Sequence, residues 1–469
     1  MTARLPREPG AGAEERRERG RQLRGDLPRS AHAAWSPGPD RADPVGTVLA
    51  QNAGRLPGLA RVRHERMAQS AFAFYRGSAA VMAADLATTA VTGLRVQACG
   101  DAHLSNFGTF ASPERTQVFD INDFDESLPG PWEWDVKRLG ASLVLAARDT
   151  GLGDEVGRTA AVAASAAYRL GIAELASRSA LEVWYARASL EDLRALAPTA
   201  AMRKGMSRAG AKARRRTSER ALGRLTESVD GARRFRSDPP LLMPLRDVAD
   251  TVVDRDDLRE QVESSFTAYV ASLAPQHQRL LARFRPVDVA LKVVGVGSVG
   301  TRCLVVLFLG LDHQEPLLLQ MKEAGRSVLE PFLEPSPHQN QGERVVSGQR
   351  LTQATSDVFL GWSRTLRGHD FYWRQLADQK GSADLAAMNA TGLCAYARAC
   401  GWTLAHGHAR SGDAPAIAGY LGGGPSFDTA IGRFSQSYAD QAVADHARFL
   451  DGIAEGRVVA GEADLVQPG

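Results

Sequence analysis

Two kinds of hydrophobic pattern alternate along this chain of 469 residues. Through most of it, apolar residues recur three and four positions apart, which is the spacing of one face of an α-helix. Two shorter stretches, near residues 96–121 and 287–321, instead carry runs of β-branched and aliphatic residues bounded by glycine and turn residues. The pattern therefore predicts an α+β protein whose strands fall in two separate islands.

The first island predicts a hairpin that follows a short strand. Val96 lies in a run that enters a glycine-flanked loop, GDAHLSNFG, and Asn106 opens a second strand. The letters ASPERT are typical of a turn, and residues 117–121 return as a strand. A helix is expected directly afterwards, because the apolar residues of PWEWDVKRLGASLVLAARD have helical spacing.

The second island predicts three successive strands. Residues 287–294 and 302–309 form β-type runs on either side of a glycine turn, and residues 316–321 form a third run that ends at Lys322. Helix is expected to dominate between the islands to about residue 275, and again from the second island to the end of the chain.

The predicted organisation has four parts. Residues 1–45, rich in Arg, Gly and Pro, are expected to form an irregular arm. Residues 46–285 form a helical lobe that carries the hairpin at 96–125, and residues 286–370 form a β-rich lobe. Residues 371–469 are expected to be a helical segment that packs on the helical lobe.

Composition excludes several classes of protein. The four cysteines are scattered without metal-ligand spacing, so neither a disulfide framework nor a zinc site is indicated. No run of 18 uncharged apolar residues occurs, and no apolar segment follows the basic start, so a cytoplasmic protein without a membrane partner is expected. The net charge of +3 gives no sign of a nucleic-acid partner. One basic cluster, residues 203–220, is either a solvated helix face or a surface that attracts phosphate.

The polar residues of the first island suit metal-assisted phosphoryl transfer. Asp101 and Asn106 have the D-x-x-x-x-N spacing in which a carboxylate orients an acceptor hydroxyl and an amide oxygen binds Mg²⁺. Asp120, Asp123 and Asp125 end the returning strand, where three carboxylates so close would repel one another without a cation. Their hard oxygen atoms favour Mg²⁺ or Mn²⁺. The alternative for Asp101 and Asn106 is a plain turn with Asx capping.

The second island offers the groups that such a reaction needs on the nucleotide. Gly295, Gly297 and Gly300 form G-x-G-x-x-G, with Ser298 inside it, between two β-runs as in a kinase phosphate loop. Lys322 then follows on a third strand. Glu343 lies on a predicted helix where a carboxylate could pair with this lysine, and Glu330 and Glu334 compete for that role. A simple hairpin loop and an exposed strand lysine are the alternatives.

Several further polar residues have supporting or open roles. His103 is expected to fix the loop by hydrogen bonding, and Asp135 to cap its helix or brace the loop. Arg76 and Arg410 are candidate anion contacts. In LAHGHARSGD, the side chains of His406, His408, Arg410 and Asp413 are metal ligands, substrate contacts or a polar helix end.

Two resemblances extend this interpretation. GDAHLSN resembles the G-D-x-H-x-x-N loop of aminoglycoside and choline phosphotransferase-like kinases, and NDFDESLPGPWEWDVKRL is similar to their metal Asp and following helix. Together with FAFYRGSA, VGVGSVGTR, LQMKEA and HARSGD, the chain resembles an uncharacterised bacterial family known as domain of unknown function 2252.

The kinase resemblance implies roles for individual residues. Asp101 would be the catalytic Asp and Asn106 the first metal ligand. Either Asp120 or Asp123 would be the second ligand, with Asp123 ranked ahead. It also implies a protein-kinase-like fold of two lobes. Because residues 295–322 follow residues 101–125, the order of the lobes would be circularly permuted.

Three hypotheses about function follow. The first is an ATP- and Mg²⁺-dependent phosphotransferase that acts on an unidentified small molecule. The second keeps the nucleotide site but transfers AMP to a protein, or only binds nucleotide as a pseudokinase. The third, a metal-dependent phosphoesterase, is disfavoured because the G-N-H-[DE] element of such enzymes does not occur.

Overall fold

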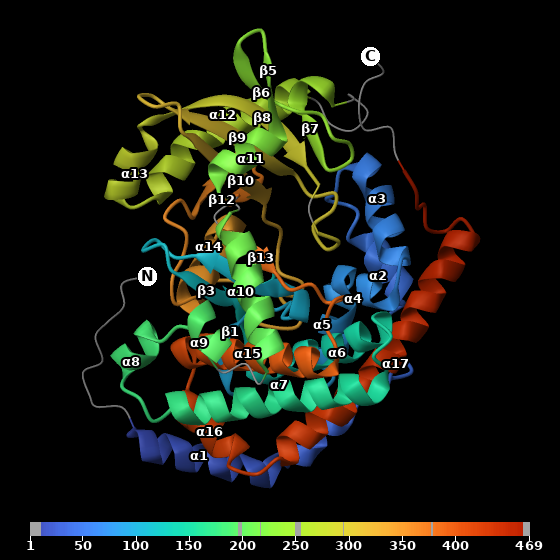
Figure 1. The fold of residues 1–469 in the computed structure, drawn as a ribbon. Helices are drawn as coiled ribbons and strands as arrows, with labels where there is room; N and C mark the ends of the chain where they lie inside the picture. The colour runs from blue at the N-terminus through green and yellow to red at the C-terminus, as the bar shows by residue number, and fades with distance from the viewer. Residues whose placement is uncertain are drawn as a thin grey trace.

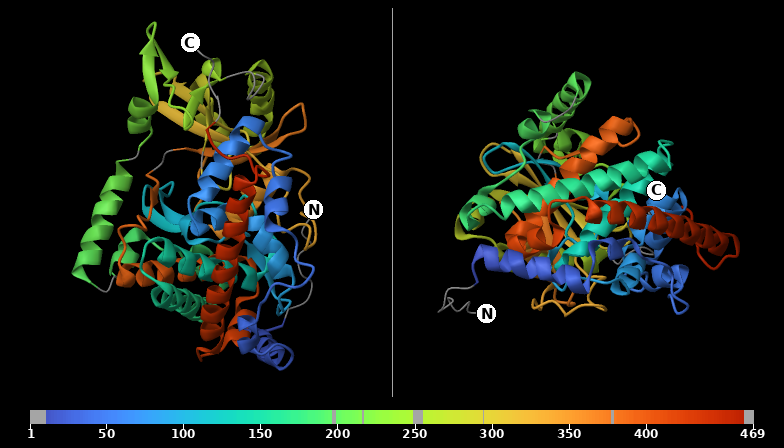
Figure 2. Two further views of the ribbon diagram at one scale, coloured as in Figure 1. Left: turned by 90° about the vertical axis from the view of Figure 1, so that its right-hand side faces the viewer. Right: turned by 90° about the horizontal axis from the view of Figure 1, so that it is seen from below.

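The computed structural model describes residues 11–195, 199–215, 217–248, 255–293, 295–376 and 379–462. It is a mixed fold with 52% helix and 16% strand, which confirms the predicted α+β class. Figure 1 shows a strand-rich part above a helix-rich part, with the long helix α17 (Ser426–Ala454) along the lower right; the left view of Figure 2 shows the same helix facing the viewer. Within the described ranges, no helix has the length and apolar character needed to cross a membrane.

A six-stranded antiparallel sheet organises the strand-rich part, in the order β11-β12-β10-β9-β8-β7. Its strands in chain order are β7 (Leu242–Pro244), β8 (Phe284–Lys292), β9 (Cys303–Gly310), β10 (Pro316–Glu323), β11 (Gly361–Arg364) and β12 (Asp370–Gln375). The three runs predicted in the second island are confirmed as β8, β9 and β10. The strands β7, β11 and β12 were not expected.

Strand β9 is buried along its whole length because both faces of the sheet are covered. Leu304, Val306 and Phe308 pack on one face beneath α12 (Arg255–Ser272), and Val305 and Leu307 pack on the other beside α11 (Ser218–Leu225). Helix α13 (Pro275–Leu281), η3 (Leu245–Asp247) and the hairpin β5 (Thr226–Val229) and β6 (Ala232–Phe235) complete this part.

Helix α12 packs on the sheet, because its Tyr269 stacks on Trp373 of β12 with ring centroids 4.5 Å apart. The segment after residue 323 is not purely helical, since β11, β12 and β13 (Gly381–Ser382) interrupt it. The expected irregular arm contains α1 (Ala13–Asp26), which packs on α16 (Ala414–Leu421).

The helix-rich part surrounds α6 (Trp132–Asp149), which is the helix predicted after the hairpin and is buried over almost its whole length. Helix α4 (Ala71–Gly77) ends at Gly77, and α5 (Ala79–Ala87) follows. The remaining elements of this part are η1 (Arg29–Ala33), α2 (Pro44–Ala50), α3 (Pro57–Ala68), α7 (Asp154–Leu175), α8 (Ala180–Tyr185), α9 (Leu190–Ala195), α10 (Ala200–Arg214), α14 (Gln341–Thr352) and α15 (Ala390–Ser411).

Two small sheets join these parts at the first sequence island. Strand β1 (Arg95–Ala98) pairs with β4 (Leu128–Pro131). The predicted hairpin is confirmed as β2 (Phe107–Ala111) and β3 (Gln117–Ile121), and β13 pairs with β2 from the far side. The turn η2 (Leu104–Asn106) separates β1 from β2, so the loop 99–106 lies between two short sheets.

The close crossing of α7 and α15 gives a test of the packing. A Cβ added to Gly401 of α15 would lie 2.0 Å from the carbonyl oxygen of Ala164 on α7, so Gly401→Ala must force the helices apart. We expect a loss of about 1–3 kcal/mol in the free energy of unfolding, as is typical of overpacking. Gly223→Ala on α11 meets no atom within 4 Å and serves as the control, which should be neutral or stabilising in the same urea titration. Equal stability of the two variants would contradict this packing.

Candidate functional site

The loop of the first island is held from behind by one buried carboxylate. Asp135, in the first turn of α6, accepts hydrogen bonds from the backbone N–H of Cys99 at 2.6 Å and of Gly100 at 2.9 Å. His408 of α15 lies 3.2 Å from the same carboxylate through Nε2, and Tyr168 of α7 lies 2.9 Å from its Nδ1. Asp135 therefore braces the loop.

The backbone at Gly100 requires glycine. Its φ is +81°, and a Cβ there would lie 2.4 Å from the carbonyl oxygen of Glu126. This close approach sets the start of the loop against the segment that follows β3. Steric constraints of the fold thus explain why a glycine precedes Asp101.

Asp101 is held by a buried arginine. Arg138 of α6 places Nε and Nη2 each 2.8 Å from Oδ1 of Asp101. The other oxygen, Oδ2, lies 3.7 Å from Nε2 of His103. Burial lowers the pKa of His103 to about 3, although Asp101 opposes this, so the imidazole is neutral. Asp101 therefore presents one oxygen fixed by a cation and one that is not.

Asn106 is oriented by the same loop. Its side-chain N–H donates to the carbonyl oxygen of Asp101 at 2.7 Å, and its backbone N–H donates to the carbonyl oxygen of His103 at 2.8 Å. The backbone N–H of Asn122, beyond β3, donates to the carbonyl oxygen of Asn106 at 2.7 Å. With its amide nitrogen so engaged, Asn106 has its side-chain oxygen left to bind a cation.

The two sequence islands meet at Lys322. Its Nζ forms an ion pair with Asp125 and lies 3.7 Å from Oδ2 of Asp123, although 197 residues separate Asp125 from Lys322. Lys322 is 1% exposed. The hydroxyl of Tyr372 donates to Oδ1 of Asp125 at 2.8 Å, so both oxygens of that carboxylate have partners.

The alternation of β10 and β12 explains how these side chains reach the hairpin. Leu319 and Met321 point into the core beneath α12, so Gln320 and Lys322 point to the other face. Tyr372 lies opposite Lys322 in the register with β12, and Arg374 lies opposite Gln320. Arg374 donates to the carbonyl oxygen of Asn122 at 2.9 Å, which ties the sheet to the end of β3.

The two carboxylates next to Lys322 have pKa values shifted in opposite directions. Burial tends to raise the pKa of Asp125, but the Lys322 ammonium and the Tyr372 hydroxyl outweigh it and leave that pKa below its usual value. Burial and the charge of Asp125 raise the pKa of Asp123. The pKa of Lys322 is well above its usual value, because the two carboxylates outweigh its burial. Asp123 is thus the carboxylate whose negative charge is less well compensated by the surrounding protein groups.

The glycine turn between β8 and β9 lies against the same group. Ser298 is 3.4 Å from Oδ2 of Asp125 through its hydroxyl. Arg55 donates to the carbonyl oxygen of Gly297 at 2.9 Å and also to that of Val299, while Gly300 has a φ of +94°. Gly295 is exposed at the start of the turn. The helix-rich part therefore anchors this turn from its own side.

Four predicted site residues lie elsewhere. Asp120 accepts from its own following amide at 2.8 Å and has Arg410 as its charged neighbour, so it is not grouped with Asp123. Glu343 is 3.4 Å from Nδ1 of His338, and the described carboxylates that contact Lys322 are Asp123 and Asp125 instead. His408 supports Asp135, and Arg410 donates to backbone carbonyls and stacks over Trp184 at 3.8 Å.

Three arginines of the site were not predicted. Arg138 lies in an apolar helix, and Arg374 lies on an unpredicted strand. Arg344 of α14 donates to the carbonyl oxygens of Asp125 and Ser127 at 2.7 Å each and to that of Gly325 at 2.8 Å. Arg344 directly follows Glu343, so α14 does reach the site, but through the next residue on the helix.

The donor atoms fit one hard cation with few protein ligands. Asn106 and Asp123 offer an amide oxygen and a carboxylate, and Mg²⁺ commonly uses one or two carboxylates together with water and phosphate. Across the described ranges, no group of three or more His, Cys, Asp or Glu side chains is placed to bind a metal ion. The expected triplet of Asp120, Asp123 and Asp125 is therefore not a preformed centre.

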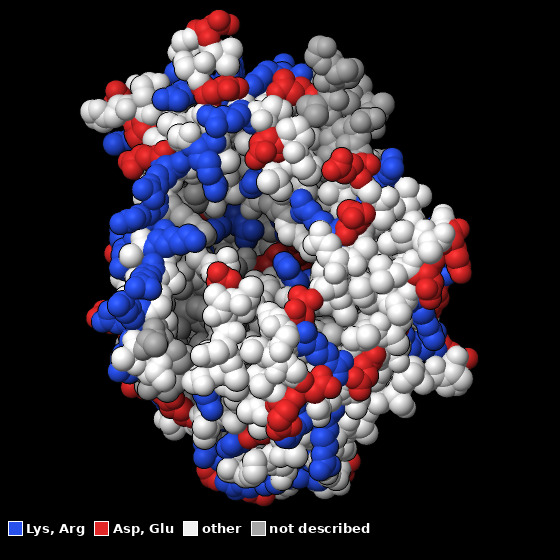
Figure 3. Space-filling view, turned by 45° about the vertical axis from the view of Figure 1, so that its right-hand side comes forward, with Lys and Arg blue, Asp and Glu red and all other residues white. Residues whose placement is uncertain are grey.

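Figure 3 shows a hollow with acidic and basic side chains inside it, flanked by a stripe of basic side chains. Helix α10 supplies exposed basic residues next to β2 and β13, and Arg214 donates to Gln117 at 2.9 Å. Arg216 of the predicted basic cluster lies outside the described residues. The exposed basic residues of α10 and its surroundings are Arg203, Lys204, Arg208, Lys212, Arg214, Arg215 and Arg220.

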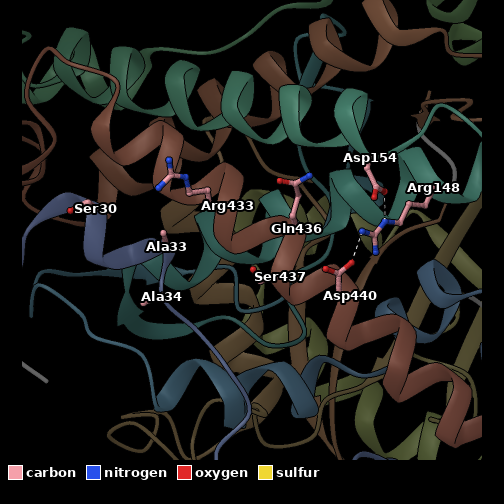
Figure 4. A pocket seen from close by; sticks show the side chains of 9 residues that line it. All are labelled: Ser30, Ala33, Ala34, Arg148, Asp154, Arg433, Gln436, Ser437 and Asp440. Atoms are coloured by element: carbon pink, nitrogen blue, oxygen red, sulfur yellow. Dashed lines mark hydrogen bonds and ion pairs between the residues drawn. The ribbon is translucent and has the colours of Figure 1, made fainter.

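A shallow pocket elsewhere on the surface is lined by α6, α7, α17 and η1 (Figure 4). Arg148 bridges Asp154 and Asp440 there, at 2.6 Å each. Neither Asp101, Lys322 nor their partners line it.

Comparison with known protein families matches residues 55–452 to the family described as "uncharacterized protein conserved in bacteria", domain of unknown function 2252. The chain belongs to this family, as the sequence motifs indicated. No curated protein and no solved structure matches the chain.

The environment of Asp120 predicts a pH effect on stability. Burial raises its pKa from 3.8 to about 7, against the opposing effects of the Ile121 and Ala354 amides and of Arg410. Between about pH 4 and 7 the unfolded chain therefore loses a proton that the folded protein keeps, and the stability of the natural protein falls as the pH rises. Asp120→Asn removes this pH-dependent contribution to the free energy of unfolding. Between pH 4 and 8, the free energy of unfolding of the variant should therefore rise by a few kcal/mol relative to that of the natural protein, at about 1.4 kcal/mol per pKa unit.

The measurement is the free energy of unfolding from urea titrations at several pH values. Asp451→Asn, at an exposed position of α17, is the control and should follow the natural protein. A constant difference between Asp120→Asn and the natural protein across this range would contradict the buried, protonated state of Asp120.

Proposed function

We propose that the protein is an ATP- and Mg²⁺-dependent phosphotransferase of the protein-kinase-like class that acts on a small molecule. The observation that carries the proposal is the meeting of Lys322 with Asp123 and Asp125 beside the Asp101 loop. A phosphoryl-transfer site needs a lysine for the phosphates, a carboxylate and an amide for the metal, and a carboxylate for the acceptor. All four are gathered here from segments far apart in the sequence.

The order of parts within the sheet also supports the proposal. In protein kinases a glycine-rich loop covers the phosphates, and the phosphate-binding lysine lies on the third strand. Here the glycine turn joins β8 to β9, Lys322 lies on β10, and α14 follows. Since this unit comes after the Asp101 loop, the proposed fold is a circular permutation of the kinase arrangement.

Each group of the site has a proposed task. Asp123 and Asn106 would hold Mg²⁺, which would neutralise charge on the phosphates when bound. Lys322 would bind the α- and β-phosphates, so that phosphate and metal together replace its present ion pairs. The glycine turn would bring backbone N–H groups to the phosphates, and Ser298 would lie next to them.

The proposed reaction has a single displacement. The acceptor hydroxyl oxygen forms a bond to the γ-phosphorus, while the bond from that phosphorus to the β,γ-bridging oxygen breaks and ADP leaves with the electron pair. The hydroxyl proton passes to Oδ2 of Asp101, the oxygen that Arg138 does not hold. Arg138 keeps the carboxylate oriented for this transfer.

Calorimetric titration of the protein with ATP in Mg²⁺ tests the proposal. The natural protein should bind, and Lys322→Met and Asp123→Asn should each weaken binding by about tenfold or more, since a hydrogen bond to a charged group contributes about 1.5–3 kcal/mol. Lys292→Met on β8, which is separated from β10 by β9, is the control and should bind as the natural protein does.

Circular dichroism of each variant separates a lost ligand from a lost fold. If the natural protein gives no heat with ATP and Mg²⁺, or if Lys322→Met binds as Lys292→Met does while both are folded, the proposal is wrong.

A further inference from the structure

The end of α4 is wedged between the Asp101 loop and the glycine turn. The carbonyl oxygen of Tyr75 accepts from Nη2 of Arg138 at 2.8 Å, and Arg138 in turn holds Asp101. On the other side, the carbonyl oxygen of Arg76 would lie 3.3 Å from a Cβ placed on Gly297. Arg63 donates to the carbonyl oxygen of Gly77 at 2.7 Å and fixes the helix end. The backbone of Arg76 is therefore locked between the two loops.

Among the described residues, the side chain of Arg76 has no counter-ion within ion-pair distance. Its Nε is buried and has no hydrogen-bond partner among the described residues, and its guanidinium lies 5.8 Å from the ring centroid of Phe72. The arginines around it are already engaged: Arg138 with Asp101, Arg55 with the glycine turn and Arg374 with Asn122. Nδ1 of His103, in the adjoining loop, is also buried and has no partner in the described part of the chain.

Such an arrangement is costly unless an anion completes it. Arg76 as a whole is partly exposed, but its Nε is buried, and a buried N–H group without an acceptor loses its hydration without compensation. Burial lowers the pKa of Arg76, and the charge of Asp101 opposes that only in part. An oxyanion between the Asp101 loop and the glycine turn would supply the missing acceptor.

We propose that Arg76 binds the phosphoryl group during its transfer, as an arginine supplied by the chain itself. This inference rests on the proposed function and adds a catalytic residue to it. A guanidinium there would face the three equatorial oxygens of the moving phosphoryl group, where negative charge is spread in the transition state. Arginine contacts of this kind contribute roughly 10³–10⁵-fold to the rate in other phosphoryl-transfer enzymes. The ground-state nucleotide would depend mainly on Lys322 and the metal.

The test compares the affinity for ADP with Mg²⁺ in the absence and presence of aluminium fluoride, which mimics the transferred phosphoryl group. In the natural protein the fluoride should tighten binding strongly. Arg76→Met should bind ADP with Mg²⁺ with an affinity within about twofold of that of the natural protein. In the presence of aluminium fluoride, its affinity should be roughly a thousandfold weaker than that of the natural protein, if Arg76 acts as the known arginine contacts do. Arg76→Lys should recover part of the tightening.

Arg350→Met is the control, since Arg350 is an exposed arginine that lies over Trp362 and donates to the carbonyl oxygen of Leu360. It should keep the full tightening. If Arg76→Met keeps the tightening, or if the natural protein binds ADP and shows none, the role of Arg76 is refuted while nucleotide binding stands. If the natural protein binds no ADP with Mg²⁺, the proposed function fails and the role of Arg76 fails with it.

Discussion

The ion pair between Lys322 and Asp125, with Asp123 beside it, is the constraint on which the rest of the site depends. A lysine that is 1% exposed needs a carboxylate partner, because an unpaired buried ammonium would cost several kcal/mol. The pair forces the end of β10 against the end of β3. Other contacts between the two parts arrive at the same segment: Arg374 reaches Asn122, Arg344 reaches the carbonyls of Asp125 and Ser127, and Tyr372 reaches Asp125. Residues 122–127 are thus the joint between the strand-rich and helix-rich parts.

A second set of contacts fixes the opposite side of the site. Tyr168, His408 and Asp135 form a buried chain of hydrogen bonds that ends on the amides of Cys99 and Gly100. Arg138, one turn further along α6, holds Asp101 and the end of α4. The Asp101 loop and the joint at 122–127 are therefore set by different elements, and Gly100 packs directly against Glu126 between them. Such double support is what a site that must hold reacting groups in fixed geometry requires.

The parts of the fold that the sequence predicted are those with strong, uninterrupted patterns. Strands β8, β9 and β10 carry long aliphatic runs, and the hairpin β2–β3 is marked by its turn. Strands β11 and β12 were missed because they are short and mix aromatic with charged residues, as in DFYWRQ. Tertiary pairing with β10, rather than local pattern, makes them strands.

The site was predicted in part for a related reason. Spacing along one loop located Asp101, Asn106 and Asp123, and the glycine turn with Lys322 was located by its neighbouring strands. Spacing could not tell which face of a helix or strand looks inward, so Glu343 was chosen where Arg344 reaches the site, and Asp120 was grouped with residues that it does not join. Arg138 had no signal, because an arginine within an apolar helix gives no sign of a partner 37 residues earlier in the chain.

The most direct test of the joint is a double-mutant cycle on stability between Lys322→Met and Asp125→Asn. Either single change leaves a buried charge or acceptor without its partner and should cost about 3–5 kcal/mol in the free energy of unfolding. The double variant should cost clearly less than the sum of the two, with a coupling of about 2 kcal/mol or more. Additive effects, within about 0.5 kcal/mol, would mean that the two residues do not meet and would contradict the site described here.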